Sequence, residues 1–404
     1  MTLDPIRIGF LPLVDAALPI LARELGFAEA EGIALELVRD ITWATVRDRL
    51  LYGHSDAAHL IAPLAIATTL GRRRPPSPLS VPFVLGLNGN AITLAPDIAE
   101  ELVPEGGLGD PKRVGIRFAA LARRRAEAGD RVRLGVVHRY SSHNFMLRYW
   151  LAQSGVRPDA DVEIVVVSPP LAADALATGE VHGICVGEPW NSVAVDRGAG
   201  RIVLVTAQIW RRGVEKVLAI PTGRMEGEPE LVHRLVRALH AAGRHFVQPD
   251  HFDQVAAILA RADYLDGSAA LIRRAISDRI LLARGGSPVH FPDFMFQHRE
   301  AANFPWVSQA AWLYSQLVRW DGLAYSDADA SAAKRVFRPD IYRAAFAGTG
   351  IPLPGASAKL EGAIARETGV GAVQGRLLLG SDSFFDDRTF DPDHIRAYLE
   401  SLPG

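Results

Sequence analysis

The feature that most constrains the fold is a regular alternation of short apolar runs with amphipathic segments along the first half of the chain. Apolar runs at residues 6–13, 33–38 and 56–61 are typical of buried strands, and the segments that follow them carry apolar residues at helical spacing. Thr42 is a candidate N-cap for one of these helices. Strands that alternate with helices favour a mainly parallel sheet covered on both faces. The sequence therefore predicts an α/β protein.

A second α/β run follows the first and then gives way to helices. Strands and helices are expected to alternate again over residues 132–220, and the pattern is mostly helical after Glu228. We therefore predict two α/β lobes and a helical C-terminal section.

Composition places the chain among ordinary globular proteins. Of its 404 residues, 49% are hydrophobic and 22% are charged, which excludes a disordered or collagen-like chain. The formal net charge of −2 gives no global reason to expect nucleic acid or an anionic membrane as partner. The single cysteine, Cys185, excludes an internal disulfide and a cysteine-cluster metal site. The first residues lead directly into an apolar run without the pattern of a secretion signal, so we expect a cytoplasmic protein.

The usual signatures of catalysis are missing from the sequence. It contains no Gly-x-Ser-x-Gly, no phosphate-binding glycine loop and no His-Glu-x-x-His. The histidines do not fall at the spacing of metal ligands, so core or surface roles are expected for His54 and His59. The acidic stretch 382–387 lacks the glycine and the closing glutamate of a calcium loop, so we expect it to be solvated. No enzyme activity and no catalytic residue are predicted.

Polar side chains lie at the ends of predicted strands at four positions, where α/β proteins commonly bind ligands. The four positions contain Trp43, the Asn-Gly-Asn segment 88–90, His143, and Gly187 and Glu188 together with the later Lys216. Each has a structural alternative. Trp43 would pack against its lobe, residues 88–90 would form a plain turn, the cluster at His143 would cap a helix, and Lys216 would be a solvated lysine at a strand end.

Several motifs, in order along most of the chain, resemble the nitrate- and bicarbonate-binding proteins of bacterial ABC transporters. The segments that carry the resemblance are residues 9–15, 42–48, 56–59, 88–92, 143–150, 186–190, 215–216, 303–306 and 338–340. The resemblance implies a two-lobed, periplasmic-binding-protein-like (type II) clamshell that holds its ligand between the lobes. Residues 1–94 would form the first part of lobe 1 and residues 95–205 lobe 2. Residues 206–404 would return to lobe 1 and form the helical C-terminal section.

The resemblance also implies a set of ligand-binding residues. In nitrate-binding members the matching positions are Trp43, Asn90, His143, Gly187, Glu188 and Lys216, with Asn90 in place of the longer glutamine of transporter members. Bicarbonate-binding relatives place an acidic residue at the position of Lys216 and recruit calcium. A lysine supplies positive charge directly, so the resemblance implies nitrate or nitrite as ligand, without a metal or other cofactor. Because Glu188 would repel an anion, we expect it to pair with Lys216 or His143, or to point away.

Members of this family without a secretion signal resemble the NasS-type nitrate and nitrite sensors, which hold the RNA-binding antiterminator NasT and release it when the anion binds. The resemblance therefore implies a cytoplasmic sensor that controls a NasT-like antiterminator of nitrate assimilation, without direct contact to nucleic acid or membrane. The alternative is the solute-binding component of a nitrate ABC importer. A clamshell enzyme of thiamine-pyrimidine synthesis finds no support in the arrangement of histidines and cysteine. Trp312, Tyr314 and Trp320 belong either to a partner surface or to a packed interior.

Overall fold

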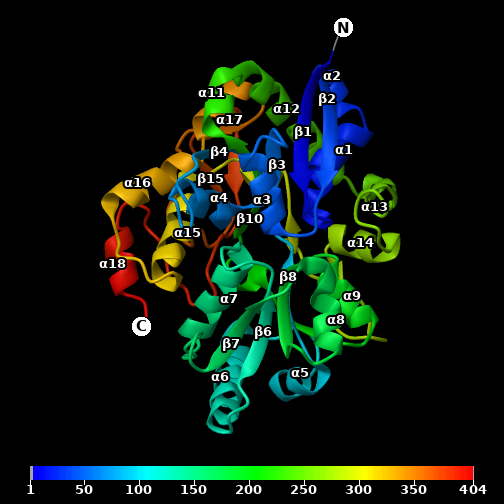
Figure 1. Ribbon diagram of the computed structural model, residues 1–404, viewed down its shortest axis with the longest axis vertical. Coiled ribbons are helices and arrows are strands. Elements are labelled where there is room, and N and C mark those ends of the chain that lie inside the picture. The colour runs from blue at the N-terminus through cyan, green and yellow to red at the C-terminus, as the bar shows by residue number, and fades with distance from the viewer. Residues whose placement is uncertain (1–2, 404) are drawn as a thin grey trace.

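Two β-sheets placed one above the other along the long axis organise the molecule (Figure 1). The computed structural model describes residues 3–403. The upper sheet, in lobe 1, has the strand order β13 (Met295–Phe296), β4 (Leu79–Asn88), β10 (Val214–Pro221), β3 (Ala57–Ile61), β1 (Asp4–Phe10), β2 (Ile33–Arg39). The lower sheet, in lobe 2, has the order β7 (Val162–Val166), β6 (Val132–Val136), β8 (Gly183–Gly187), β5 (Asn90–Leu94), β9 (Arg201–Val205). This is the two-lobed α/β architecture that the sequence predicts.

Both sheets are mixed, which corrects the expectation of a mainly parallel sheet. In lobe 1, β1 is parallel to β2 and β3, whereas β10 is antiparallel to β3 and β4. In lobe 2, β6 is parallel to β7 and β8, whereas β5 is antiparallel to β8 and β9. The reversed strands are β5 and β10. The chain enters the lobe 2 sheet from lobe 1 at β5 and returns to the lobe 1 sheet at β10. β5 follows the lobe 1 sheet after a single residue, and β10 follows the lobe 2 sheet after the four-residue helix α10 (Thr206–Ile209). Neither is preceded by a crossover helix that returns the chain to the same sheet, which is the connection that makes neighbouring strands parallel.

The chain passes between the lobes at two adjacent places. Gly89 alone separates β4 of lobe 1 from β5 of lobe 2, and the return to β10 passes through α10 (Thr206–Ile209). Asn88 and Gly89 have φ angles of 57° and 81°, the left-handed region that favours glycine, so the segment predicted as a plain turn is a crossover between sheets. Asn88 Nδ2 donates to the Arg211 carbonyl at 2.9 Å and thereby ties the two crossings together. We propose Gly89 and residue 205 as the divisions between the lobes, because the predicted limit at residue 94 would assign β5 to lobe 1, whereas β5 pairs within the lobe 2 sheet.

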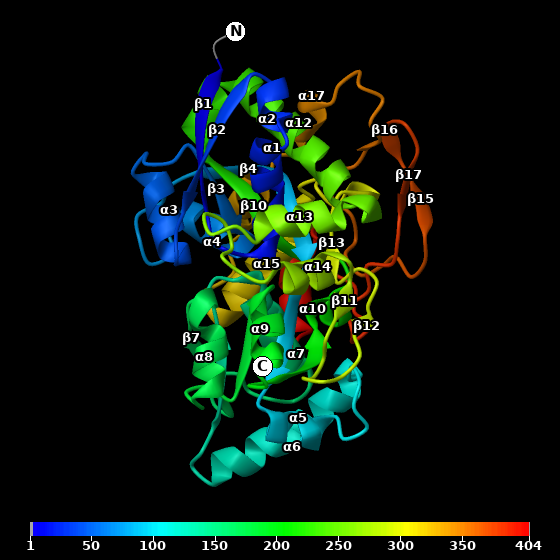
Figure 2. The ribbon, with the colours of Figure 1, turned by 90° about the vertical axis from the view of Figure 1, so that its right-hand side faces the viewer.

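Helices cover both faces of the lobe 1 sheet (Figures 1 and 2). On one side lie α1 (Ala17–Glu24), α2 (Phe27–Ala30), α12 (Pro229–Phe246) and α13 (Phe252–Leu259). On the other lie α3 (Trp43–Leu51), α4 (Ala62–Thr69), α15 (Val307–Trp320) and α16 (Asp327–Val336). The helix α12 illustrates how a helix covers the sheet. Its buried residues recur every three or four positions, so one apolar face of the helix lies against the sheet.

Five helices complete lobe 2 and the rest of the chain is made of short elements. The lobe 2 helices are α5 (Pro96–Leu102), α6 (Pro111–Glu127), α7 (Ser142–Gln153), α8 (Ala172–Ala177) and α9 (Trp190–Asp196). The remaining elements are α11 (Thr222–Gly227), α14 (Ala269–Ile276), α17 (Pro339–Ala345), α18 (Ile395–Glu400) and the strand pairs β11 (Arg279–Ile280) with β12 (Val289–His290), β14 (Leu353–Pro354) with β16 (Ala372–Gln374), and β15 (Thr368–Val370) with β17 (Leu377–Leu379). Within residues 3–403, no helix combines the length and the apolar character needed to cross a membrane.

The helical C-terminal section contacts both lobes. Its helix α15 packs against α4 of lobe 1 and α7 of lobe 2. Phe384 stacks on Trp210, with 5.1 Å between ring centroids, and lies 5.7 Å from the rings of Tyr149 and Trp312. One apolar core therefore runs from lobe 1 through this aromatic cluster into lobe 2. Trp312 and Tyr314 are fully buried, which confirms the packed-interior interpretation for these two residues.

The acidic stretch 382–387 is only partly solvated, which corrects the sequence prediction. Asp382 is 1% exposed and forms an ion pair with Lys359. Asp386 accepts a hydrogen bond from the Tyr149 hydroxyl at 2.8 Å. The stretch therefore contributes to the contact between the C-terminal section and lobe 2.

Candidate functional site

The residues predicted to bind a ligand gather where the two lobes meet. Trp43 begins α3 and Lys216 lies on β10, both in lobe 1, while Asn90, His143 and Gly187 lie on β5, α7 and β8 of lobe 2 (Figure 1). The side chains of Trp43, Asn90, His143 and Lys216 are at most 1% exposed. Thr42 caps α3 as predicted, since its side chain accepts from the Thr45 backbone N–H at 3.1 Å.

Lys216 Nζ lies between two buried carboxylates. It is 2.8 Å from Asp15 Oδ2 and 2.6 Å from Glu215 Oε1. Burial acts to lower the pKa of Lys216, but the two carboxylates outweigh it and raise that pKa above its ordinary value. Burial acts to raise the carboxyl pKa values, but Lys216 and the neighbouring histidines hold the pKa of Asp15 below its usual range and that of Glu215 at about 2. All three groups are therefore charged at neutral pH.

Each carboxylate also binds a histidine. His59 Nε2 lies 2.9 Å from Asp15 Oδ1, and His143 Nδ1 lies 2.8 Å from Glu215 Oε1. Burial lowers the pKa of His59, although Asp15 acts in the opposite direction. We call the chain His59–Asp15–Lys216–Glu215–His143 the buried charge network. It joins the centre of the lobe 1 sheet to the first turn of α7 in lobe 2.

The network is surrounded by polar atoms that have no partner within residues 3–403. The indole of Trp43 lies beside it, with its ring centroid 5.3 Å from Lys216 Nζ and 5.4 Å from the His59 ring. The buried unpartnered atoms here are Trp43 Nε1, His59 Nδ1, Asn90 Oδ1, His143 Nε2 and Glu215 Oε2. Buried polar groups are normally hydrogen-bonded. Their concentration at one place indicates a site for a small polar ligand.

Gly187 allows the two lobes to approach each other at this site. A Cβ atom at this position would lie 3.3 Å from Asn90 Oδ1 and 3.4 Å from both Asp15 Oδ2 and Leu13 Cδ2. A Cβ atom alone would press on the Asn90 amide oxygen, and a larger side chain would have no room between the lobes. Glycine fits this position because the backbone of β8 has to lie close to Asn90, Asp15 and Leu13.

Glu188 turns its carboxylate away from the network, one of the arrangements expected from the sequence. Its Oε2 accepts from the Ser192 backbone N–H at 3.3 Å, in α9, and burial raises its pKa to about 7. Its backbone carbonyl accepts from the Val14 N–H at 2.8 Å, and Trp190 Nε1 donates to the Pro12 carbonyl at 3.2 Å. This segment therefore connects the lobes through the Glu188 carbonyl and the Trp190 indole.

Three members of the network were missing from the site predicted from the sequence: Asp15, His59 and Glu215. Each lies in a segment that carried the family resemblance. The core role expected for His59 is correct as regards burial but omits its bond to Asp15. The sequence did contain an indication of these residues, because a charged or imidazole side chain within an apolar segment needs a buried partner.

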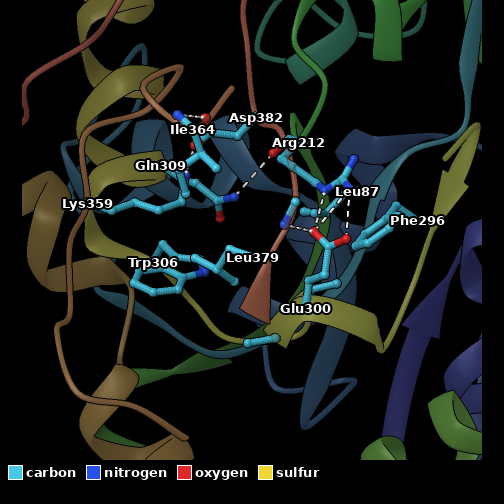
Figure 3. A pocket seen from close by; sticks show the side chains of 13 residues that line it. Leu87, Arg212, Phe296, Glu300, Trp306, Gln309, Lys359, Ile364, Leu379 and Asp382 are labelled. Atoms are coloured by element: carbon cyan, nitrogen blue, oxygen red, sulfur yellow. Dashed lines mark hydrogen bonds and ion pairs between the residues drawn. The ribbon is translucent and has the colours of Figure 1, made fainter. Parts of the chain in front are cut away.

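A second polar cavity lies in the C-terminal section and is a different kind of site (Figure 3). It is lined by Arg212, Glu300, Gln309, Lys359 and Asp382, among others, and has a volume of about 20 Å³, room for about one water molecule. Arg212 pairs with Asp293 and Glu300, and Lys359 pairs with Glu361 and Asp382. These paired cations stabilise the packing of the C-terminal section on lobe 1. Among the described residues, no group of three or more His, Cys, Asp or Glu side chains is placed to hold a metal ion.

The two-lobed architecture, with charged side chains buried between the lobes, is that of the periplasmic-binding-protein class of folds. Residues 2–260 match the model of the NMT1-like family, and the chain belongs to this family. It is 30% identical to the nitrate/nitrite binding protein NrtA of Synechococcus elongatus, over 98% of this chain and 86% of that protein. It is also 30% identical to the nitrate import ATP-binding protein NrtC of the same organism, over 98% of this chain and 55% of that protein.

A solved structure agrees with the fold. The crystal structure of the periplasmic nitrate-binding protein NrtA from Synechocystis PCC 6803 superimposes with a TM-score of 0.85 at 24% identity, covering 99% of this chain and 98% of that one. The predicted clamshell class is thereby confirmed. The named relatives are binding and transport proteins, in agreement with the expectation that this chain is not an enzyme.

Proposed function

We propose that this chain binds nitrate or nitrite between its lobes and serves as the solute-binding component of an ABC importer. The observation that carries the proposal is the buried ammonium of Lys216 at the lobe junction, beside the indole of Trp43. Nitrate is flat and singly charged, so it needs donors in its plane and an aromatic or apolar surface on its face. Lys216 and Trp43 Nε1 supply donors, and His143 offers a further nitrogen.

The affinity depends on how many such donors contact the anion. Charge-assisted hydrogen bonds contribute roughly 1.5–3 kcal/mol each. Micromolar binding corresponds to about 8 kcal/mol, so several such bonds have to act together against the costs of association and of ordering the lobes.

Lys216 also distinguishes between anions. Relatives include proteins named for nitrate and a bicarbonate transport ATP-binding protein, CmpC of Synechocystis, which is 29% identical to this chain. The ammonium of Lys216 supplies the positive charge that would otherwise require a bound cation. The presence of Lys216 therefore favours nitrate or nitrite as the ligand, rather than bicarbonate bound together with calcium.

Calorimetry with the purified chain tests the proposal. Nitrate, nitrite and bicarbonate are each titrated with and without calcium. We expect nitrate and nitrite to bind without calcium. Absence of binding by both anions, or binding of bicarbonate alone in the presence of calcium, would refute the proposed ligand.

The choice between import and sensing rests at present on the names of the relatives, which support import. The sensor function, with a NasT-like antiterminator as partner and a cytoplasmic location, stays a prediction. It is tested by titrating nitrate into a mixture of the chain and such an antiterminator. A sensor requires partner affinity to fall as nitrate binds, with reciprocal coupling, whereas an importer component should show no complex.

A further inference from the structure

The buried charge network has an unbalanced charge before any ligand binds. Asp15 and Glu215 contribute two negative charges and Lys216 one positive charge, so with both imidazoles neutral the network carries −1. A ligand anion bound in the same buried site would bring the total charge to −2. Uncompensated buried charge is strongly unfavourable, so the lysine alone does not account for anion binding.

His143 is placed to correct this balance. Its Nδ1 faces Glu215 Oε1 at 2.8 Å, and a carboxylate partner requires Nδ1 to carry the hydrogen. In the neutral imidazole, Nε2 is then a bare lone pair, and this atom is buried without a partner within residues 3–403. Protonation converts Nε2 from an acceptor, which repels an anion, into a charged donor.

The other titratable groups around His143 do not compete with it for a proton. Glu215 and Lys216 face it from β10, His138 lies close to it in the loop before α7, and the Cys185 thiol of β8 contacts its backbone carbonyl. Burial and nearby arginines lower the pKa of His138 to about 4, and burial raises that of the Cys185 thiol, so both stay neutral.

His59 is less suited to this role. It lies within the lobe 1 sheet, packed beside the Trp43 ring, and burial lowers its pKa. His143 comes instead from lobe 2, across from Lys216, so a charge there places cationic donors on both sides of the junction.

We propose that the chain takes up one proton with each anion and that His143 receives it. The proposal rests on the proposed function, because it concerns the same site. Nitrate is the suitable probe, since it does not itself accept a proton near neutral pH and any proton taken up must reside on the protein.

The test is calorimetry of nitrate binding at pH 8 in phosphate and in Tris, two buffers with different ionisation enthalpies. We expect the observed enthalpy to change with the buffer by the amount that corresponds to about one proton per anion. The dissociation constant should also rise by about tenfold per pH unit over the pH range in which one proton is taken up per anion.

Variants identify the acceptor. His143→Gln keeps a hydrogen-bonding side chain that cannot titrate, and it should bind nitrate more weakly with no dependence on buffer or pH. His394→Gln, an exposed histidine of the C-terminal section, should keep the wild-type behaviour. Glu188→Gln tests a different buried group, since burial raises the pKa of Glu188 to about 7.

The outcomes separate this proposal from the proposed function. If the wild type binds nitrate with the same enthalpy in both buffers, proton uptake is overturned but the ligand assignment stays intact. This result does not depend on the folding of any variant. Buffer dependence that persists in His143→Gln, or that disappears in Glu188→Gln alone, overturns the assignment to His143. If the wild type binds neither nitrate nor nitrite, the proposed function itself fails.

Discussion

At the scale of single residues, the site depends on a lysine that is stable in a buried position only because two carboxylates face it. Removing one partner of a buried ion pair costs about 3–5 kcal/mol because the other charge is left uncompensated. Asp15 and Glu215 therefore keep Lys216 charged, and Lys216 keeps them ionised. The arrangement maintains a cationic donor next to Trp43 in an interior from which charges are normally excluded.

Lys216→Glu should abolish nitrate binding, because it replaces the donor by a third buried carboxylate. We expect the dissociation constant in calorimetry to rise at least a hundredfold, about 3 kcal/mol. Lys216→Met serves as a milder second variant, and circular dichroism checks that both fold. Lys112→Glu is the matched control, since this lysine is 55% exposed and pairs with a surface aspartate. Nitrate affinity that survives in Lys216→Met would remove Lys216 from the site.

Trp43→Phe should weaken nitrate binding about tenfold while leaving the fold unchanged. The phenyl ring keeps an aromatic surface but lacks the buried Nε1–H, which has no partner within residues 3–403. A hydrogen bond to a charged group contributes about 1.5–3 kcal/mol, and part of this is recovered by relaxation. Titration calorimetry measures the change, and an unaltered affinity would show that the indole N–H does not contact the anion.

Glu188 provides a test of the effect of pH on stability. Its pKa is raised from 4.5 to about 7 in the folded chain, so its contribution to stability is present below pH 4.5 and is lost as the pH rises to 7. Glu188→Gln mimics the protonated form. It should raise the free energy of unfolding relative to the wild type by up to roughly 3 kcal/mol at pH 8 and by much less at pH 5. Denaturant unfolding at both values measures this, and an equal effect at both would contradict it.

At the scale of elements, the sequence patterns located most strands and helices but not the pairing of β5 and β10. Periodicity predicts a strand, but its direction in the sheet depends on where the chain comes from. The same limit applies to the site. Trp43, His143 and Lys216 follow from the family motifs, whereas Asp15 and His59 become recognisable only when β1 and β3 lie side by side.

The C-terminal segment around Phe384 packs on α7 of lobe 2 and on the crossing between the lobes, through Tyr149 and Trp210. Phe384→Ala should lower the free energy of unfolding by about 3–5 kcal/mol, because it leaves a cavity between Trp210 and Trp312. The neighbouring Phe385, which is only partly buried, is the control, and Phe385→Ala should cost distinctly less. Equal losses in denaturant unfolding would show that the aromatic cluster does not carry this contact.

At the scale of the whole molecule, the lobes contact each other both at the site and at its edge. Beyond the charge network, the carboxylate of Asp321 at the end of α15 pairs with Arg72 of lobe 1 at 3.4 Å and with Arg139 of lobe 2 at 3.3 Å. Ligand binding can shift the lobes only by its different affinity for their arrangements. These contacts and the shared apolar core join the two lobes. We therefore expect ligand binding to move one lobe only slightly relative to the other, about the crossings near Gly89.

A crystal structure of the chain grown with nitrate tests the central claim most directly. The claim is that an ammonium held between two carboxylates binds an oxyanion at the junction of the lobes. We expect nitrate within hydrogen-bond distance of Lys216 Nζ, His143 Nε2 and Trp43 Nε1. An anion found elsewhere, or a Lys216 side chain that points into solvent in the complex, would contradict it.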